Sequence, residues 1–129
     1  MKNKKTELSK TEWLIMNICW KKGKSSARDI FEESLKTKTR SYHTVKTMLD
    51  RLVVKGYLAR EKFGPIWLYS PIAAKSRTTK KEIERFVSTV LDNTFTPLLS
   101  FFTEKVSLTD EEIQSLEKLI EEKKKGKTK

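Results

Sequence analysis

Five polar side chains within residues 40–57 (RSYHTVKTMLDRLVVKGY) could take part in chemistry: His43, Lys46, Thr47, Asp50 and Arg51. His43 is the only histidine in the chain. It precedes Asp50 by seven residues, about 10 Å along a helix, which is too far for a base and the acid that orients it. The sequence has no phosphate-binding glycine loop, no HExxH and only one cysteine. We therefore expect no enzyme activity, no metal site and no cofactor.

The same segment is predicted to be a helix over residues 41–55 with two different faces. Its apolar residues recur at helical spacing: Val45, Met48, Leu49, Leu52 and Val53. At roughly 100° per residue, the five polar side chains fall together on the opposite arc. Ser41 can cap this helix at its start, and Gly56 can end it. We expect the polar face to point outward and to meet a partner.

Two helices are predicted before this segment and a β-hairpin after it. Ser9 and Glu12 form a capping-box pattern that begins a helix over residues 10–22, and the next serines begin a short second helix. YLAREKF and IWLYSP predict two strands around Gly64-Pro65. This is the winged helix-turn-helix order, in which the third helix enters the major groove and the hairpin contacts the DNA backbone. The expected fold is mainly α with a small β-hairpin wing.

Positive charge is concentrated in the first half of the chain. The whole chain carries 28 basic and 17 acidic side chains, net +11. Residues 1–72 carry 16 basic and 7 acidic side chains, net +9, whereas residues 73–122 are net −3. A field of this kind suits a polyanion such as DNA. We expect residues 1–72 to be a DNA-binding domain and residues 73–129 a helical dimerisation region with a basic, disordered tail.

Amphipathic helices are predicted in the second half. Thr78 or Thr79 can cap the first of them, in which apolar residues recur at helical spacing from Ile83 to Phe95. PLLSFF follows as an apolar segment, and Thr109 with Glu112 forms a second capping box. Fifty-seven residues cannot cover so much apolar surface, so we expect a twofold homodimer. The alternative is that these stripes pack on the N-terminal domain of the same chain. The residues expected at the dimer contact are Ile83, Phe86, Val87, Val90, Leu91, Phe95, Leu98, Leu99, Phe102, Ile113, Leu116, Leu119 and Ile120.

Two patterns resemble the penicillinase and methicillin-resistance repressors, the BlaI/MecI family. They are E-W-x-x-M-x-x-x-W over residues 12–20 and T-V-K-T-x-L-x-R-L-x-x-K-G over residues 44–56. The similarity extends from Leu8 to about Leu119. It implies a homodimeric winged-helix repressor that binds palindromic operator DNA, with β-lactam-resistance genes as expected targets. Two alternatives stay open: a repressor of another stress operon with a different inducer, and a protein-interaction module with an acidic partner.

The polar face, the wing and the resemblance together assign the expected DNA contacts: Ser41, Tyr42, His43, Thr44, Lys46, Thr47, Arg51, Arg60 and Lys62. Many family members carry Pro at the position of Tyr42 and Lys or Arg at that of His43. The operator is therefore expected to differ from the usual one of the family.

The resemblance also implies a mode of induction. In the β-lactam-responsive members, induction proceeds by proteolysis of an Asn-Phe bond in the dimerisation region, and the resemblance implies a membrane sensor-protease that acts on the repressor. The matching bond here is Ser100-Phe101, with Ser in place of Asn. The copper-responsive relatives end in Cys-x-Cys motifs, which this chain lacks. A thiolate copper switch is therefore excluded.

The cellular location is predicted from three features of the sequence. Cys19 has no second cysteine with which to form an internal disulfide, which fits a reducing compartment. No apolar run is long enough to span a bilayer, and the basic N-terminal segment lacks the apolar core of a secretory signal. We expect a cytoplasmic protein that does not insert into the membrane.

Overall fold

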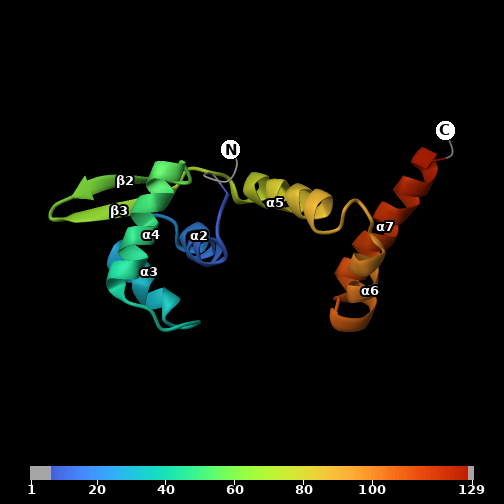
Figure 1. Cartoon of the computed structure of the whole chain (residues 1–129), viewed down its shortest axis with the longest axis horizontal. Helices are drawn as coiled ribbons and strands as arrows, with labels where there is room; N and C mark the ends of the chain where they lie inside the picture. The colour runs from blue at the N-terminus through green and yellow to red at the C-terminus, as the bar shows by residue number, and fades with distance from the viewer. Residues whose placement is uncertain (1–6, 128–129) are drawn as a thin grey trace. The chain divides into compact units, whose positions relative to one another are not determined.

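A computed structural model describes residues 7–127, which form two compact units, one up to Lys81 and one from Glu82 (Figure 1). The elements in chain order are α2 (Lys10–Lys22), β1 (Ser25–Ser26), α3 (Ala27–Ser34), α4 (Tyr42–Lys55), β2 (Leu58–Phe63), β3 (Ile66–Pro71), α5 (Lys75–Thr89), α6 (Thr96–Lys105) and α7 (Asp110–Lys127). The first unit holds α2 to β3 and the start of α5.

Side-chain caps begin α2, α3 and α4, as the sequence predicted. The Ser9 hydroxyl accepts from the Glu12 amide at 3.2 Å, and the Glu12 carboxylate accepts from the Ser9 amide at 2.8 Å. Ser26 caps α3 and Ser41 caps α4 in the same way, each accepting from the amide three residues later. Gly56 ends α4 with a φ of 91°, a left-handed conformation that costs glycine little.

A buried apolar core joins α2, α3, α4 and the sheet. From α4 it takes Val45, Leu49 and Leu52, all at 0% exposure, so the predicted apolar face of this helix is confirmed. The other buried apolar members are Leu8, Ile15, Met16, Cys19, Ala27, Ile30, Leu58 and Tyr69. Burial of this one face leaves the opposite side of α4 for other contacts.

The strands form an antiparallel sheet of order β1-β3-β2. The β2–β3 hairpin was predicted, with Gly64 at the turn in a left-handed conformation (φ 61°). β1 was not predicted, because two serines before a helix cap carry no strand periodicity; it pairs Ser25 with Tyr69 and Ser26 with Leu68. A helical unit with this small sheet confirms the predicted winged-helix fold class.

The first unit continues past residue 72, where the sequence predicted a boundary. The Trp20 indole N–H donates to the Ala73 carbonyl at 2.9 Å, and Thr78 is buried. The Thr78 hydroxyl donates to the Ala74 carbonyl at 2.9 Å, so this residue lies inside α5 and does not cap it. α5 therefore begins at Lys75, before the predicted caps at Thr78 and Thr79. Back-bonding to the preceding turn gives the hydroxyl a partner within the helix.

α5 also ends earlier than predicted, at Thr89. Asp92 and Asn93 adopt left-handed conformations (φ 50° and 59°), which short polar side chains tolerate and which break the helical repeat. The apolar spacing predicted to run through Phe95 is therefore interrupted, and Phe95 lies just before α6.

The PLLSFF segment lies within α6, with Pro97 in its first turn. The predicted second capping box begins α7: Thr109 accepts from the Glu112 amide at 3.1 Å, and Glu112 accepts from the Thr109 amide at 3.0 Å. α7 continues to Lys127, so the basic tail is helical rather than disordered as far as it is described. Lysine is a good helix former, and cations are favourable near a helix C-terminus. Residues 128–129 lie outside the described part.

Candidate nucleic-acid interface

The first turns of α4 carry the most accessible part of the expected DNA surface. Ser41, His43, Thr44, Thr47 and Arg51 are all exposed. The hydroxyls of Ser41 and Thr44 are hydrogen-bonded at 2.8 Å while Ser41 also caps the helix. This surface can therefore offer hydroxyl and imidazole groups, which both donate and accept, beside one guanidinium.

Tyr42 packs back against α3. Its ring lies edge-to-face with Phe31 at 5.7 Å between centroids, and the Arg28 guanidinium carbon lies 4.8 Å from its centroid. Arg28 is itself exposed. The sequence did not point to Arg28, because a cation on the second helix has no periodic relation to a ring on the third. The Tyr42 ring thus holds the Arg28 side chain of α3 beside the first turn of α4.

Asp50 and Lys46 are half-buried against the wing. One Asp50 carboxylate oxygen accepts from the Tyr69 hydroxyl at 2.7 Å and from an Arg60 guanidinium nitrogen at 3.0 Å. The other accepts from the Lys46 ammonium at 2.8 Å. Both residues face away from the core, as predicted, but the hairpin packs along this edge of the helix and leaves them half-buried rather than fully exposed.

Asp50, Lys46, Arg60 and Tyr69 form a cluster in which the opposite charges stabilise one another. Burial raises the pKa of Asp50, but hydrogen bonds from Lys46 and Tyr69 and the charge of Arg60 outweigh burial and leave that pKa below 3.8. The pKa of Lys46 is raised, first because its ammonium donates to Asp50. The pKa of Tyr69 is also raised, by burial and then by its bond to Asp50. At neutral pH the cluster therefore holds an ionised carboxylate, a protonated lysine and a neutral phenol.

The wing holds its two predicted cations over one indole ring. The guanidinium carbon of Arg60 lies 4.5 Å from the Trp67 centroid, and the Lys62 ammonium lies 5.1 Å from it. Lys62 and Trp67 are direct partners in the β2–β3 register. Cation–π contacts of this kind restrict where a long side chain can reach. Trp67 was missed from the sequence; its place opposite Lys62 follows only once the register is known.

A buried ion pair anchors the other end of α4. The Lys55 ammonium donates to the Glu12 carboxylate at 2.7 Å and to the Glu7 carbonyl at 2.9 Å. Glu12 is 1% exposed. Burial raises its pKa, but the hydrogen bond from Lys55 and those involving Ser9 outweigh burial and lower it overall. The sequence predicted Glu12 only as half of a capping box, whereas the structure also makes it the link between α2 and α4.

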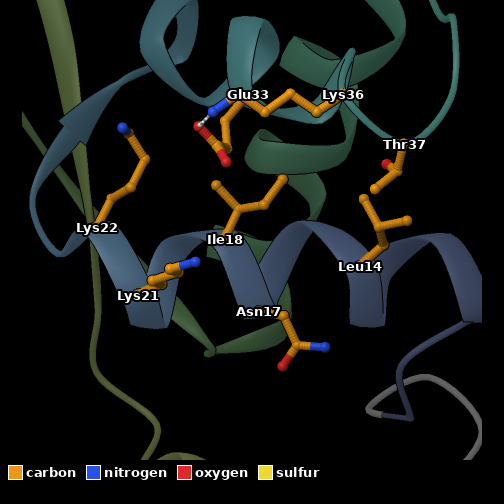
Figure 2. A pocket seen from close by; sticks show the side chains of 8 residues that line it. All are labelled: Leu14, Asn17, Ile18, Lys21, Lys22, Glu33, Lys36 and Thr37. Carbon is orange, nitrogen blue, oxygen red and sulfur yellow. Dashed lines mark ion pairs between the residues drawn. The ribbon is translucent and has the colours of Figure 1, made fainter.

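A surface cleft of about 570 Å³ lies between α2 and the end of α3 (Figure 2). Leu14 and Ile18 project from α2 toward α3, and Lys36 pairs with Glu33 across 3.2 Å. The remaining lining residues are Asn17, Lys21, Lys22 and Thr37. None of the expected DNA contacts lines this cleft, so it is separate from the α4 surface.

The Cys19 thiol is unreactive, and the acidic groups of the described residues do not form a metal-binding cluster. Cys19 is at 0% exposure, and burial raises the pKa of its thiol to about 12, so it stays protonated and unreactive. Within residues 7–127, no three His, Cys, Asp or Glu side chains are grouped so as to hold a metal ion. No helix in that range is long and apolar enough to cross a membrane.

The expected dimer residues are largely uncovered in the single chain. Val87, Leu91 and Leu98 are half-buried, and the other ten are exposed. In α6, Ser100 and Phe101, the two residues of the expected scissile bond, are exposed as well, Phe101 at 51%. None of residues 82–126 is buried.

Three helices, a hairpin packed on the third, and a polar face on that helix define a winged-helix DNA-binding protein. The model of the penicillinase repressor family matches residues 8–122. The methicillin resistance regulatory protein MecI of Staphylococcus aureus strain N315 is 35% identical over 123 residues, which cover 95% of this chain and 100% of that protein. The penicillinase repressor of Bacillus licheniformis is 31% identical over 121 residues, or 94% of each chain.

Among solved structures, a repressor of this kind is also similar to this chain. The solution structure of the DNA binding domain of the repressor BlaI matches with a TM-score of 0.50 and 35% identity, over 54% of this chain and 84% of that one. The chain therefore belongs to the penicillinase repressor family and is a repressor of the BlaI/MecI type. This confirms the resemblance drawn from the sequence.

Proposed function

We propose that two copies of the chain bind a palindromic operator, with each α4 in the major groove and each β2–β3 wing on the adjacent backbone. The observation that carries this proposal is the exposed polar turn of α4 beside two wing cations stacked on Trp67. A polar helix face can read base edges, while cations beside it neutralise phosphates. The net charge of +9 over residues 1–72 supplies the attraction that is independent of sequence.

The exposure and position of each residue suggest which side chains contact base edges and which contact phosphates. His43, Thr44 and Thr47 are exposed along the outer side of α4, where they suit base edges. Ser41 and Arg51 lie toward the two ends of that surface and suit phosphates. Lys62 suits the backbone beside the wing. Asp50 holds Lys46 and Arg60 in place by hydrogen bonds. The Tyr42 ring holds Arg28 in the same manner by a cation–π contact. These three cations would therefore meet DNA from fixed positions.

The second unit supports the dimer proposal by its lack of a core. With no buried residue among 82–126, α6 and α7 have no interior to hold them together in one chain. A second copy can cover Phe86, Phe102, Leu116 and the other apolar residues, and twofold pairing matches an operator with two half-sites. A fold-back onto the winged helix of the same chain would predict a monomer.

The regulatory setting follows by analogy with the named relatives. We propose a cytoplasmic repressor of β-lactam-resistance genes that is inactivated when a sensor-protease pathway cuts Ser100-Phe101 in α6. A cut there would separate α5 from α7 and remove the tether between two DNA-binding heads. The serine at this bond favours a second candidate, a repressor of another stress operon whose inducer acts without this cleavage.

Selection of genomic fragments by the purified full-length chain tests the proposal. We expect the bound fragments to share a twofold-symmetric site, with half-sites one or more helical turns apart, upstream of the regulated genes. A protein-interaction module with an acidic partner would leave no such site and no footprint. Fragments with single, asymmetric sites would contradict the dimeric repressor.

A further inference from the structure

Asp50 is the only acidic residue of α4, and it lies within the surface proposed to face DNA. A carboxylate facing phosphates is unfavourable unless cations neutralise it. Here it accepts three hydrogen bonds, from Lys46 on the same helix, Arg60 on β2 and Tyr69 on β3. One side chain thus joins the recognition helix to both strands of the wing.

The hairpin register brings these partners to a single place. Arg60 and Tyr69 are paired across β2 and β3, so their side chains leave the same face of the hairpin and meet Asp50 together. Lys46 lies one helical turn before Asp50. The cluster therefore fixes the position of the wing relative to α4, as well as the side chains themselves.

The side chains of Lys46 and Arg60 are restricted in their positions by these contacts. Arg60 lies between the Asp50 carboxylate at 3.0 Å and the Trp67 ring at 4.5 Å. Lys46 is bonded to Asp50 at 2.8 Å and is partly covered, with 30% of its side chain exposed. A mobile cation can follow the phosphates of any duplex, whereas a cation held in place meets a phosphate only where the DNA has the matching shape.

We infer that Asp50 is a specificity-determining residue that lowers affinity for random DNA by holding Lys46 and Arg60 in fixed positions and by setting the angle of the wing. This inference rests on the proposed function, because it concerns the same surface. It assigns a role to a residue that makes no DNA contact of its own.

The test compares Asp50→Asn with the wild-type chain in fluorescence anisotropy titrations. The two probes are a labelled duplex containing a site selected by the wild-type protein and a scrambled duplex of the same base composition. Both are titrated at several salt concentrations with the full-length chain. Glu84→Gln on α5 is the control, because it raises the net charge by the same one unit at an exposed position.

We expect Asp50→Asn to bind the scrambled duplex up to about tenfold more tightly at ~0.1 M salt, because one additional phosphate contact steepens the salt slope by about 0.9. The ratio of affinities for selected and scrambled duplexes should fall by a similar factor. Glu84→Gln should change both affinities less than about twofold, since Glu84 is exposed and is not among the hydrogen-bond partners of Asp50.

Tyr69→Phe separates positioning from charge and also covers the case in which Asp50→Asn fails to fold. It removes one of the three donors to Asp50 and leaves the net charge unchanged. We expect its affinity ratio to fall as well, by less than that of Asp50→Asn. A simple gain of positive charge predicts no change for Tyr69→Phe, and that result would overturn the positioning role.

The remaining outcomes separate this inference from the proposed function. Equal weakening of both duplexes by Asp50→Asn would show that Asp50 only stabilises the fold and would refute the inference. An unchanged ratio would refute it too. If the wild-type chain itself does not distinguish the two duplexes, the proposed function fails first.

Discussion

Glu12→Gln should destabilise the winged-helix unit through its link between α2 and α4. Removing one partner of a buried ion pair costs about 3–5 kcal/mol, because the other charge is left unpaired. Glutamine keeps an oxygen for the Ser9 amide, and Lys55 keeps the Glu7 carbonyl and is 17% exposed, so we expect a loss of about 2–3 kcal/mol. For a unit of this size that lowers Tm by roughly 10–20 °C.

The loss of stability caused by Glu12→Gln should also depend on pH. The pKa of Glu12 is lower in the folded state than its ordinary 4.5, so its contribution is fully present above that value. It is lost as the pH falls through the folded-state pKa. The difference in free energy of unfolding between the wild-type chain and Glu12→Gln should therefore be largest near pH 7 and shrink below about 4.5.

Urea unfolding followed by tryptophan fluorescence measures this difference directly. All three tryptophans (Trp13, Trp20 and Trp67) lie in the first unit, so the signal reports that unit alone. Glu84→Gln, on the exposed side of α5, is the matched control and should change the free energy of unfolding by less than about 0.5 kcal/mol. A change equally small for Glu12→Gln at pH 7, or a difference that persists unchanged at pH 4, would refute the assigned role of the pair.

Three further predictions address the thiol, the dimer and the DNA surface. Cys19 should react with a thiol reagent only at the rate of global unfolding, because it is fully buried and its pKa is about 12; fast reaction of the native protein would contradict this. Leu116→Asp should convert a dimer to a monomer in analytical ultracentrifugation and reduce operator affinity by 10²-fold or more (an order-of-magnitude estimate), while tryptophan fluorescence still shows a folded first unit. Thr47→Ala should relax base preference at one operator position in a binding-site selection, whereas Lys62→Ala should weaken all duplexes alike and reduce the salt slope by about 1. Identical behaviour of these two variants would contradict the division into base and backbone contacts.

Local features explain why much of the first unit could be predicted. Ser9, Ser41 and Gly56 act through atoms three or four residues away, so the sequence alone locates the ends of the helices. The buried face of α4 follows from a single period, and Val45 and Leu49 lie where that period puts them.

Contacts between elements could not be predicted in the same way. A helical period separates Lys46 and Asp50 from the core face but carries no information on the hairpin that packs beside them. Their partners on β2 and β3 depend on the strand register and on how the wing packs against α4. In α5, Thr78 matches a cap pattern by residue type, yet the helix begins about one turn earlier, at Lys75, and the Thr78 hydroxyl donates back to the Ala74 carbonyl.

We propose that α4 of each copy reads the major groove of a symmetric operator. Methylation interference at guanine N7, an atom exposed only in the major groove, tests it most directly on a site selected by the wild-type chain. We predict interference at guanines in two symmetric half-sites whose centres lie one helical turn, about 34–36 Å, or a multiple of this apart. Strong binding with no interference at guanine N7, or with interference in one half-site only, would contradict this mode of binding.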